Sequence, residues 1–458
     1  DTTEDLGVNL GATGQTTLTI TLEETTKTFL GAKEEGIYPL YWSEGDKISV
    51  NGIVSEALTE GGSNKALFTF NEELEYPYSV LYPASEEAKV TFPTTQTFID
   101  GTFSEGSVPM YGYAAEAGDA IQMMPLSGLL RFTVTGAGSL ASLVVSAENA
   151  NLSGTFAVDC AAEGELTADE STTAQSVTVS FGENGLQLTA DAATAQPIYV
   201  AVPAGSYGTV TVTFYTTTGE CMVKKFDSTK PINARAVREF GNIEFVAGEG
   251  AEDGVYLIYS KESLFAFANA VSTEGFDTTY PTAKVVADID LTGADWTSIN
   301  GFAGTFDGGN HKIVGLNAPL FETTSATIAN VKLTGVAIEK EVTAPNNCGA
   351  LVSNYAGASI SNCSASGSMN IVGNCSADSG SRFGGLIGFA TTAATLSTLT
   401  NDVDITVTGA FSGSSHTLIV AGIIGSQKEK VAITASGLTN NGNLTVGDAT
   451  ASSVSKTL

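Results

Sequence analysis

Histidine and cysteine are scarce in this sequence of 458 residues, and their scarcity limits the chemistry open to it. There are two histidines, His311 and His416, and five cysteines without any Cys-x-x-Cys spacing. Zinc sites are built from several such ligands grouped at short spacings, so we expect none. Neither an EF-hand loop nor a Gly-Gly-x-Gly-x-Asp array is present, so we expect no metal site and no cofactor.

Long apolar runs are also missing, and the stretch 418–424 is among the longest. A membrane helix requires about 20 apolar residues, so we expect no membrane span. The first residues, Asp1-Thr2-Thr3-Glu4-Asp5, have neither the basic nor the apolar region of a signal peptide. We therefore expect a mature or trimmed form of the chain.

Positive charge is the third deficiency. Twenty Lys and Arg stand against fifty Asp and Glu, which leaves a formal charge of −30. This charge repels phosphate backbones and anionic lipids, so we expect neither nucleic-acid nor membrane-surface binding. Charged residues make up only 15% of the chain and Gly is abundant, a composition that favours an exported all-β protein over a cytosolic enzyme.

The odd number of cysteines leaves at least one thiol unpaired within the chain. Cys160 and Cys221 can form a disulfide if their strands are neighbours. Buried free thiols are the commoner state outside small, disulfide-dense domains, and the sequence does not decide between the two states.

Alternating apolar and polar residues dominate the first half of the sequence. This period of two predicts half-buried antiparallel strands. The clearest segments are 16–22, 47–50, 129–134, 176–181 and 209–214. Short turns with Pro and Gly separate them, which predicts a β-sandwich. With a change of pattern near Met124-Pro125, we predict one sandwich domain over 1–124 and a second over 125–248.

A small, acidic, glycine-rich stretch at 246–254 predicts a linker to a third domain over 249–458. Just after it, a short helix is predicted, with Ser260 as its N-cap. Its apolar residues recur at i, i+3, i+4 and i+7 on one face, namely Leu264, Phe267, Ala268 and Val271.

An internal repeat follows the helix. The segment 349–352 recurs at 384–388 and at 421–425, spaced by 35 and then 37 residues, and each copy precedes an Asn-bearing turn and an alternating strand. A unit of this size made of short strands cannot bury its apolar face alone, but stacked units can. The repeat therefore predicts a right-handed parallel β-helix with Val, Ile, Leu and Cys pointing inward.

The segment 302–316, followed by 320–321 and 328–333, resembles the opening coils of GLUG-type β-helix repeats. The preceding 287–291 and 295–297 fit the same pattern. The resemblance covers about 260–448 and implies the β-helix fold. It implies little about function, because such repeats occur in adhesins, secreted proteases and surface lipoproteins.

The first half resembles the fimbrillin (Mfa-like) family of Bacteroidetes surface proteins over about 15–245. The residues that carry this resemblance are 45–50, 80–84, 108–112 and 124–134. The family implies a lipoprotein precursor, two transthyretin-like sandwiches, and pilus assembly in which a strand of one subunit completes the sheet of another. Main-chain hydrogen bonds alone supply the affinity in such strand addition.

One feature departs from the family pattern. Maturation of polymerising fimbrillins needs cleavage after a basic residue, usually Arg, in the N-terminal domain, yet the first arginine here is Arg131. Lys27 or Lys33 can substitute for it. A tip or anchored accessory subunit therefore fits the sequence better than a stalk subunit.

Parallel β-helices also house polysaccharide hydrolases and lyases. A hydrolase uses paired carboxylates, and the pairs Asp402 with Asp404 and Asp288 with Asp290 each share a strand face. Outward carboxylates on such strands normally solvate the surface. Lyases typically use a basic residue, and Arg382 is the only arginine after position 238. With His416 lacking an evident partner, and without a nucleophile elbow or phosphate loop, we expect no catalytic residues.

Exposed aromatic residues are the remaining candidates for ligand contact, because aromatic rings stack on sugars and anchor interfaces. Tyr38, Tyr41 and Trp42 are the candidate contacts. Core packing is the alternative explanation for each of them.

We therefore predict a non-enzymatic cell-surface adhesion or fimbrial protein, as a tip or accessory subunit, on the outer-membrane surface or a fimbria. A lipid anchor is expected on a residue removed from this chain. The predicted partners are other fimbrial subunits, or a host or glycan ligand. Two alternatives are a carbohydrate-active or carbohydrate-binding β-helix on a fimbrillin-like stem, and a purely structural pilus subunit. A groove lined by carboxylates and aromatics favours the carbohydrate-active protein, whereas a flat face of Ser, Thr and Asn favours adhesion.

Overall fold

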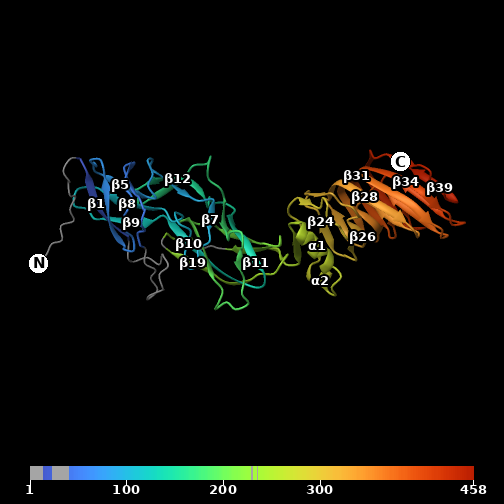
Figure 1. The fold of residues 1–458 in the computed structure, drawn as a ribbon, viewed down its shortest axis with the longest axis horizontal. Coiled ribbons are helices and arrows are strands. Elements are labelled where there is room, and N and C mark those ends of the chain that lie inside the picture. The colour runs from blue at the N-terminus through green and yellow to red at the C-terminus, as the bar shows by residue number, and fades with distance from the viewer. Residues whose placement is uncertain (1–13, 23–40, 228–230, 235, 458) are drawn as a thin grey trace. The chain divides into compact units, whose positions relative to one another are not determined.

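A computed structural model describes residues 14–22, 41–227, 231–234 and 236–457. It is nearly all β, with 54% of residues in strands and 3% in helices, which confirms the predicted all-β class. The chain divides into two compact units (Figure 1). Unit 1 holds the described residues up to Thr217 together with Val223–Val246, and unit 2 holds Thr218–Met222 and the residues from Ala247 onward.

Unit 1 begins with a seven-stranded sheet in the order β3-β2-β5-β8-β9-β1-β4. The predicted strand at 16–22 is β1, in which every second side chain is buried. The buried set packs in a cluster with Trp42 and Phe68. The strands of this sheet are β1 (Thr16–Leu22), β2 (Ser49–Val50), β3 (Ile53–Val54), β4 (Lys65–Phe70), β5 (Tyr78–Tyr82), β8 (Met110–Ala114) and β9 (Ile121–Pro125).

Three further sheets complete unit 1, with strand orders β16-β10-β19, β18-β17-β11-β14-β7 and β13-β12-β6. β15 pairs with β11 beside the second of these. Their strands are β6 (Lys89–Phe92), β7 (Thr95–Thr97), β10 (Ser127–Thr135), β11 (Ser139–Ala147), β12 (Gly154–Asp159), β13 (Glu165–Ala168), β14 (Ser176–Ser180), β15 (Leu186–Gln187), β16 (Pro197–Pro203), β17 (Thr209–Thr216), β18 (Cys221–Asp227) and β19 (Val237–Glu244).

The pairing in unit 1 is mixed, which corrects the prediction of antiparallel strands. β1 pairs in parallel with β9, β10 with β19, and β14 with β7. The sequence could not show this, because a period of two reports only which face of a strand is buried and says nothing of the direction of its neighbours. Strands β6 and β7, from before residue 124, pair with β12 and β14. The division of 1–248 into two sandwich domains stays a prediction.

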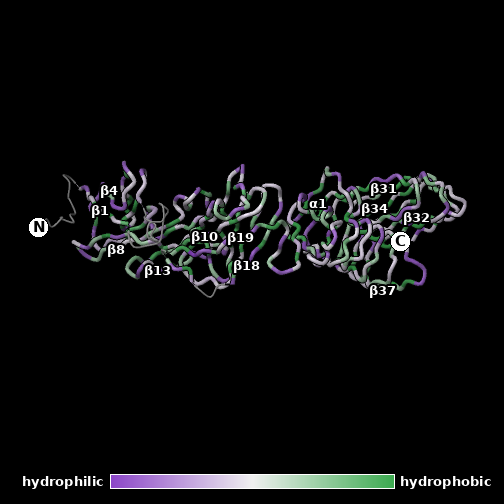
Figure 2. The backbone as a smooth tube through the Cα atoms, turned by 90° about the horizontal axis from the view of Figure 1, so that it is seen from below, coloured by the Kyte–Doolittle hydropathy of each residue, from purple (hydrophilic) through white to green (hydrophobic). Residues whose placement is uncertain are grey.

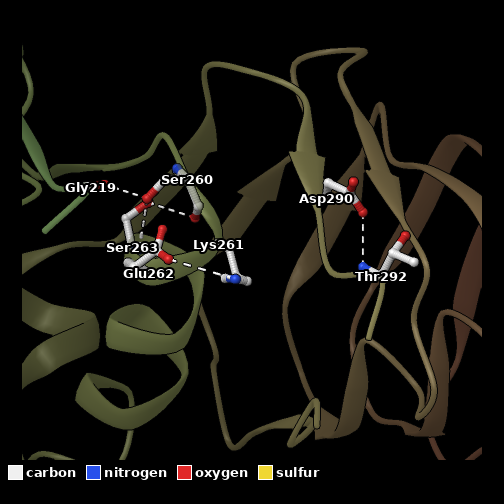
Figure 3. Close-up of polar contacts among 7 residues, drawn as sticks. All are labelled: Gly219, Ser260, Lys261, Glu262, Ser263, Asp290 and Thr292. Carbon is white, nitrogen blue, oxygen red and sulfur yellow. Dashed lines mark hydrogen bonds and ion pairs between the residues drawn. The ribbon is translucent and has the colours of Figure 1, made fainter. Parts of the chain in front are cut away.

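Unit 2 opens with β20 (Val255–Ile258), helix α1 (Lys261–Ala270) and helix α2 (Phe276–Thr279). Ser260 is the N-cap of α1, as predicted: its side chain accepts a hydrogen bond from the backbone N–H of Ser263 at 3.1 Å (Figure 3). The Ser263 hydroxyl accepts one in return from the backbone N–H of Ser260 at 2.7 Å. The predicted apolar face is inward, with Leu264 and Phe267 fully buried.

The rest of unit 2 consists of three sheets whose strands pair in parallel. The largest contains β20, β21 (Thr282–Val285), β22 (Ile289–Asp290), β24 (Thr305–Asp307), β25 (Lys312–Val314), β27 (Thr327–Ala329), β28 (Lys332–Val342), β31 (Ser359–Cys375), β34 (Ala394–Phe411), β37 (Ile433–Asn440) and β38 (Leu444–Val446). The second contains β23 (Ile299–Asn300), β26 (Phe321–Thr324), β30 (Val352–Tyr355), β33 (Ile387–Ala390) and β36 (Ile424–Gln427). The third contains β29 (Asn347–Gly349), β32 (Gly380–Gly384), β35 (Thr417–Ala421) and β39 (Ser453–Thr457).

The chain visits these sheets in a fixed cycle, and we call one such passage a coil. Along the second sheet, Ile299 pairs with Phe321, Phe321 with Val352, Val352 with Ile387, and Ile387 with Ile424. The spacing between paired residues grows from 22 to 31, 35 and 37 residues. The last two values are those of the sequence repeat, so the repeated segments stack on one another in register.

Glycine recurs in the repeat because the backbone approaches itself closely there. A Cβ atom at Gly349 would lie 2.5 Å from the carbonyl oxygen of Leu386, and one at Gly384 would lie 2.1 Å from that of Ile387. Real Cβ atoms essentially never come so close to a backbone atom. Any other residue would force neighbouring strands apart at these points.

A single hydrophobic cluster fills unit 2 from Tyr256 to Leu444. Hydrophobic and hydrophilic residues alternate along the chain (Figure 2), as expected where one face of each strand points inward. The inward columns include Cys348, Cys363 and Cys375, and all five cysteines of the protein are free and buried. The disulfide considered between Cys160 and Cys221 is therefore absent.

Candidate binding surface

The most regular outward surface of unit 2 lies on β31, β34 and β37. These strands pair in parallel without a break in register across nine positions that all carry Ser or Thr. We call this set the hydroxyl face. Its columns are Ser359-Thr395-Thr434, Ser361-Ser397-Ser436 and Ser364-Thr400-Thr439.

The hydroxyl face is neutral, and its side chains are open to solvent. Ser359 and Thr395 point outward because Ile360 and Leu396, the next residues, are buried. Adjacent strands lie about 4.8 Å apart, so each column spaces its hydroxyls at about that distance. None of the nine side chains has a hydrogen bond to another described residue. Each hydroxyl therefore keeps one donor and two acceptor positions for water or a ligand.

Sequence reasoning did not identify this face. Its signal is present: an alternating Ser/Thr pattern at Ser359 and Ser361 recurs at Thr395 and Ser397. The pattern gains meaning only when the pairing brings the copies side by side, because isolated Ser and Thr residues are common on any surface.

Beside the hydroxyl face, Asp402 and Asp404 bond to the next coil. Asp402 accepts a hydrogen bond from the side-chain amide of Asn441 at 2.8 Å. Asp404 accepts two from Asn443, one from its backbone N–H at 2.8 Å and one from its side chain at 2.9 Å. These exposed carboxylates join strands together, which gives them a structural role.

The second carboxylate pair is engaged in the same way. Asp288 accepts a hydrogen bond from the backbone N–H of Lys312 at 2.9 Å, and the ring of His311 lies 3.3 Å away. The bond from Lys312, followed by those with His311, lowers the pKa of Asp288 below its usual range. Asp290 accepts from the backbone N–H of Thr292 at 2.8 Å (Figure 3), and hydrogen bonds from Thr292 lower its pKa too.

His416 has partners that the sequence did not reveal, and the expectation that it lacks one was wrong. Its ring is fully buried, with Nδ1 2.9 Å from the carbonyl oxygen of Ala377 and Nε2 3.1 Å from the hydroxyl of Ser381. These partners lie 39 and 35 residues away in the sequence, so only the stacking of coils brings them together. A ring without solvent contact holds the fold and does not meet a substrate.

Arg382 also serves the fold. Its guanidinium lies 4.4 Å from the ring centroid of Phe389, a cation–π contact. Burial lowers its pKa. Among the described residues no group of three or more His, Cys, Asp or Glu is arranged to hold a metal ion. No helix in the described part of the chain is long and apolar enough to cross a membrane.

The three predicted aromatic contacts have different surroundings. Tyr38 lies outside the described residues. Tyr41 is 49% exposed, whereas Trp42 is 1% exposed and packs edge-on against Phe68 and Tyr82, with centroid distances of 5.0 and 5.5 Å. Trp42 therefore matches the alternative of core packing, and ligand contact by Tyr41 stays a prediction.

Unit 2 has no described groove lined by aromatic residues. Its exposed large apolar side chains, among the described residues, are Val372 and Val454. A cavity of about 390 Å³ lies near β25 and has one carboxylate, Asp295, and no aromatic side chain in its lining. Of the two surfaces that distinguish adhesion from carbohydrate chemistry, the structure has the flat one rich in Ser and Thr.

No protein-family model matches the chain. No curated protein matches it either. Among solved structures, a candidate cell adhesion protein from Bacteroides uniformis is 15% identical, with a TM-score of 0.30, and the match covers 51% of this chain and 93% of that one.

A fimbrial protein from Bacteroides ovatus is 10% identical, with a TM-score of 0.23, and 51% of this chain matches 50% of that one. A candidate immunoglobulin A1 protease from Bacteroides ovatus is 14% identical, with a TM-score of 0.25, and 43% of this chain matches 84% of that one. TM-scores this low do not establish a shared fold. These likenesses therefore assign neither a family nor a function to the chain.

Proposed function

We propose that this is a non-enzymatic adhesion protein that presents the hydroxyl face to a ligand outside the cell. In this proposal unit 2 is a right-handed parallel β-helix, and unit 1 is a stem of two transthyretin-like sandwiches. The observation that carries the proposal is the array of nine outward hydroxyls in continuous register on β31, β34 and β37.

A flat array of hydroxyls suits the binding of an extended polar ligand. Each hydroxyl both donates and accepts a hydrogen bond, so the face can pair with the hydroxyls of a glycan or the peptide groups of a matrix protein. The parallel ladder beneath it is rigid, so little conformational entropy is lost when a ligand binds. The neighbouring carboxylates already bond to Asn441 and Asn443, which leaves the array itself uncharged.

The proposal includes a place at the outer-membrane surface or on a fimbria, with a lipid anchor on a residue absent from this chain. A net charge of −30 supports solubility outside the cell. Other fimbrial subunits, joined by strand addition, are the proposed assembly partners, and the family resemblance of unit 1 supports this. A purified chain that stays monomeric after protease treatment would contradict assembly by polymerisation.

The test of adhesion is an array of immobilised glycans and host-matrix proteins, probed with the full chain. A bound glycan or matrix protein identifies the ligand class. The variant Ser397→Arg then places a bulky charge at the centre of the hydroxyl face. We expect it to weaken the signal about ten-fold or more, because a charge buried without a partner is costly.

The matched control is Ser426→Arg, on β36 in a different sheet of unit 2. Ser426 and Ser397 are both half-buried, so the two changes disturb their strands to a similar degree. Adhesion through the hydroxyl face is contradicted if the full chain binds nothing on the array. It is also contradicted if the two variants bind equally well.

A further inference from the structure

A second feature, in unit 1, has the properties of a small-molecule site. A cavity of about 270 Å³ is lined by Tyr41, Trp42, Asp46, Tyr82, Thr102 and Glu105, together with apolar residues. Pockets that hold drug-sized ligands measure about 300 to 1,000 Å³. This cavity therefore fits a ligand no larger than one or two small rings.

Two buried polar atoms of this lining lack a hydrogen bond. They are the indole Nε1 of Trp42 and the hydroxyl oxygen of Thr102. Leaving such an atom unpaired costs about 1–3 kcal/mol, so native proteins rarely do so without a reason. Trp42 is held in place, because its backbone N–H donates to the carbonyl oxygen of Ser63 at 2.8 Å and its ring packs on Phe68.

Trp42 also borders a neighbouring cavity of about 360 Å³. Thr102 lines only the first of the two. The 270 Å³ cavity is therefore the one that has both unpaired atoms in its lining. We call it the Trp42 cavity.

The acidic residues of the Trp42 cavity define what charge it accepts. Asp46 accepts hydrogen bonds from the Tyr82 hydroxyl at 2.8 Å and from the backbone N–H of Ser43 at 2.7 Å. A carboxylate has about four acceptor positions, so Asp46 keeps two for a ligand. Burial, reinforced by the charges of Asp46 and Glu105, raises the pKa of Tyr82, so this phenol keeps its proton.

No Lys or Arg is among the described residues that line the cavity. Two carboxylates without a cation repel an anionic ligand, which excludes acidic sugars and phosphates. An ammonium ligand has donors only and would leave the Trp42 Nε1 unpaired, because an indole N–H also only donates. The ligand that pairs with every group has hydroxyls, which donate to carboxylates and accept from N–H.

The apolar part of the lining completes the match. Tyr41 is 49% exposed and Ile99 40% exposed while both line the cavity, so their apolar surface is open to a ligand. A pyranose ring presents C–H groups on its faces and hydroxyls around its edge. We propose that the Trp42 cavity binds one neutral pyranose unit of a glycan, with its face on Tyr41 and its hydroxyls bonded to Asp46, Glu105 and Trp42.

This inference does not rest on adhesion through the hydroxyl face, since the two sites share no residue. The test uses the full chain in a Trp296→Phe background. The protein has two tryptophans, so Trp42 becomes the only one. The probes are the methyl glycosides of glucose, galactose, mannose and N-acetylglucosamine, titrated against tryptophan fluorescence.

We expect a saturable fluorescence change with at least one probe and a dissociation constant near 1 mM, the scale of about −4 kcal/mol. Glu105→Gln removes a charged acceptor from an exposed position, and we expect it to weaken binding about ten-fold. Tyr41→Ala should weaken binding by a similar factor. Glu44→Gln is the matched control, because Glu44 is an exposed acid of the same loop that does not line the cavity.

Two results would overturn the proposal. One is the absence of a saturable change with all four glycosides up to about 10 mM, ten times the expected dissociation constant. The other is binding that Glu105→Gln and Tyr41→Ala leave as strong as Glu44→Gln does. Glu105 and Tyr41 are both exposed, so their replacement preserves the fold, and circular dichroism checks this.

Discussion

The inward columns of unit 2 can be tested at Ile328. This side chain is fully buried on β27, where it pairs with Phe306 of the preceding coil and Ile360 of the following one. Replacing it by alanine removes three carbon atoms and leaves a cavity. Changes of this kind cost about 2–5 kcal/mol, and parallel pairing on both sides prevents the site from collapsing, which favours the upper half of that range.

The matched control is Thr327→Ala, one residue earlier on the same strand. Thr327 is half-buried and points to the other face of the sheet. Surface changes of this kind are usually within about 0.5 kcal/mol of neutral. The two variants remove similar numbers of atoms, so they differ mainly in the face from which the atoms are removed.

Urea denaturation, followed by the fluorescence of Trp296, measures the difference. Trp296 is buried in unit 2, and a Trp42→Phe background removes the signal from unit 1. With a urea dependence of about 1–3 kcal/mol per molar, Ile328→Ala should lower the midpoint by about 1 M or more. The reasoning is refuted if Thr327→Ala lowers the midpoint as much, or if Ile328→Ala leaves it unchanged.

Three further changes probe single contacts. Ser260→Ala should destabilise α1 by about 1 kcal/mol and speed its amide hydrogen exchange, and unchanged exchange would argue against the cap. Asp288→Asn should lower the melting temperature at pH 7: the folded pKa of Asp288 is lowered, so its contribution is present above about pH 3.9 and lost as the pH falls through the folded value. A gap from the parent that persists at pH 2 would contradict this. Asp404→Ala leaves the backbone N–H of Asn443 unpaired and should reduce the exchange protection of β38, whereas Asp448→Ala should not.

The local structure of this chain could be predicted because each feature depends on nearby residues. The strand at 16–22, the Ser260 cap and the stacking of the repeats at 35 and 37 residues follow from periodicity and spacing alone. Strand direction in unit 1 could not be predicted. The contacts that decide it join residues as distant as Ile20 and Ile121.

The candidate sites were harder to predict for the same reason. The hydroxyl face exists only where three coils lie side by side, and no single strand shows it. Tyr41 and Trp42 were identified as aromatic residues, but the sequence could not show that one is exposed and the other buried. Thr102 and Glu105, which join them in one cavity, lie about sixty residues further along the chain.

The growing spacing between paired residues has a consequence for folding. In a solenoid of identical repeats, a segment can pair with the wrong neighbour, one repeat out of place, at little cost. Here the distances of 22, 31, 35 and 37 residues all differ, so a shifted segment has a perimeter that does not match the coil beneath it. Unequal perimeters therefore act against misregistered states, and each coil has one partner of suitable length.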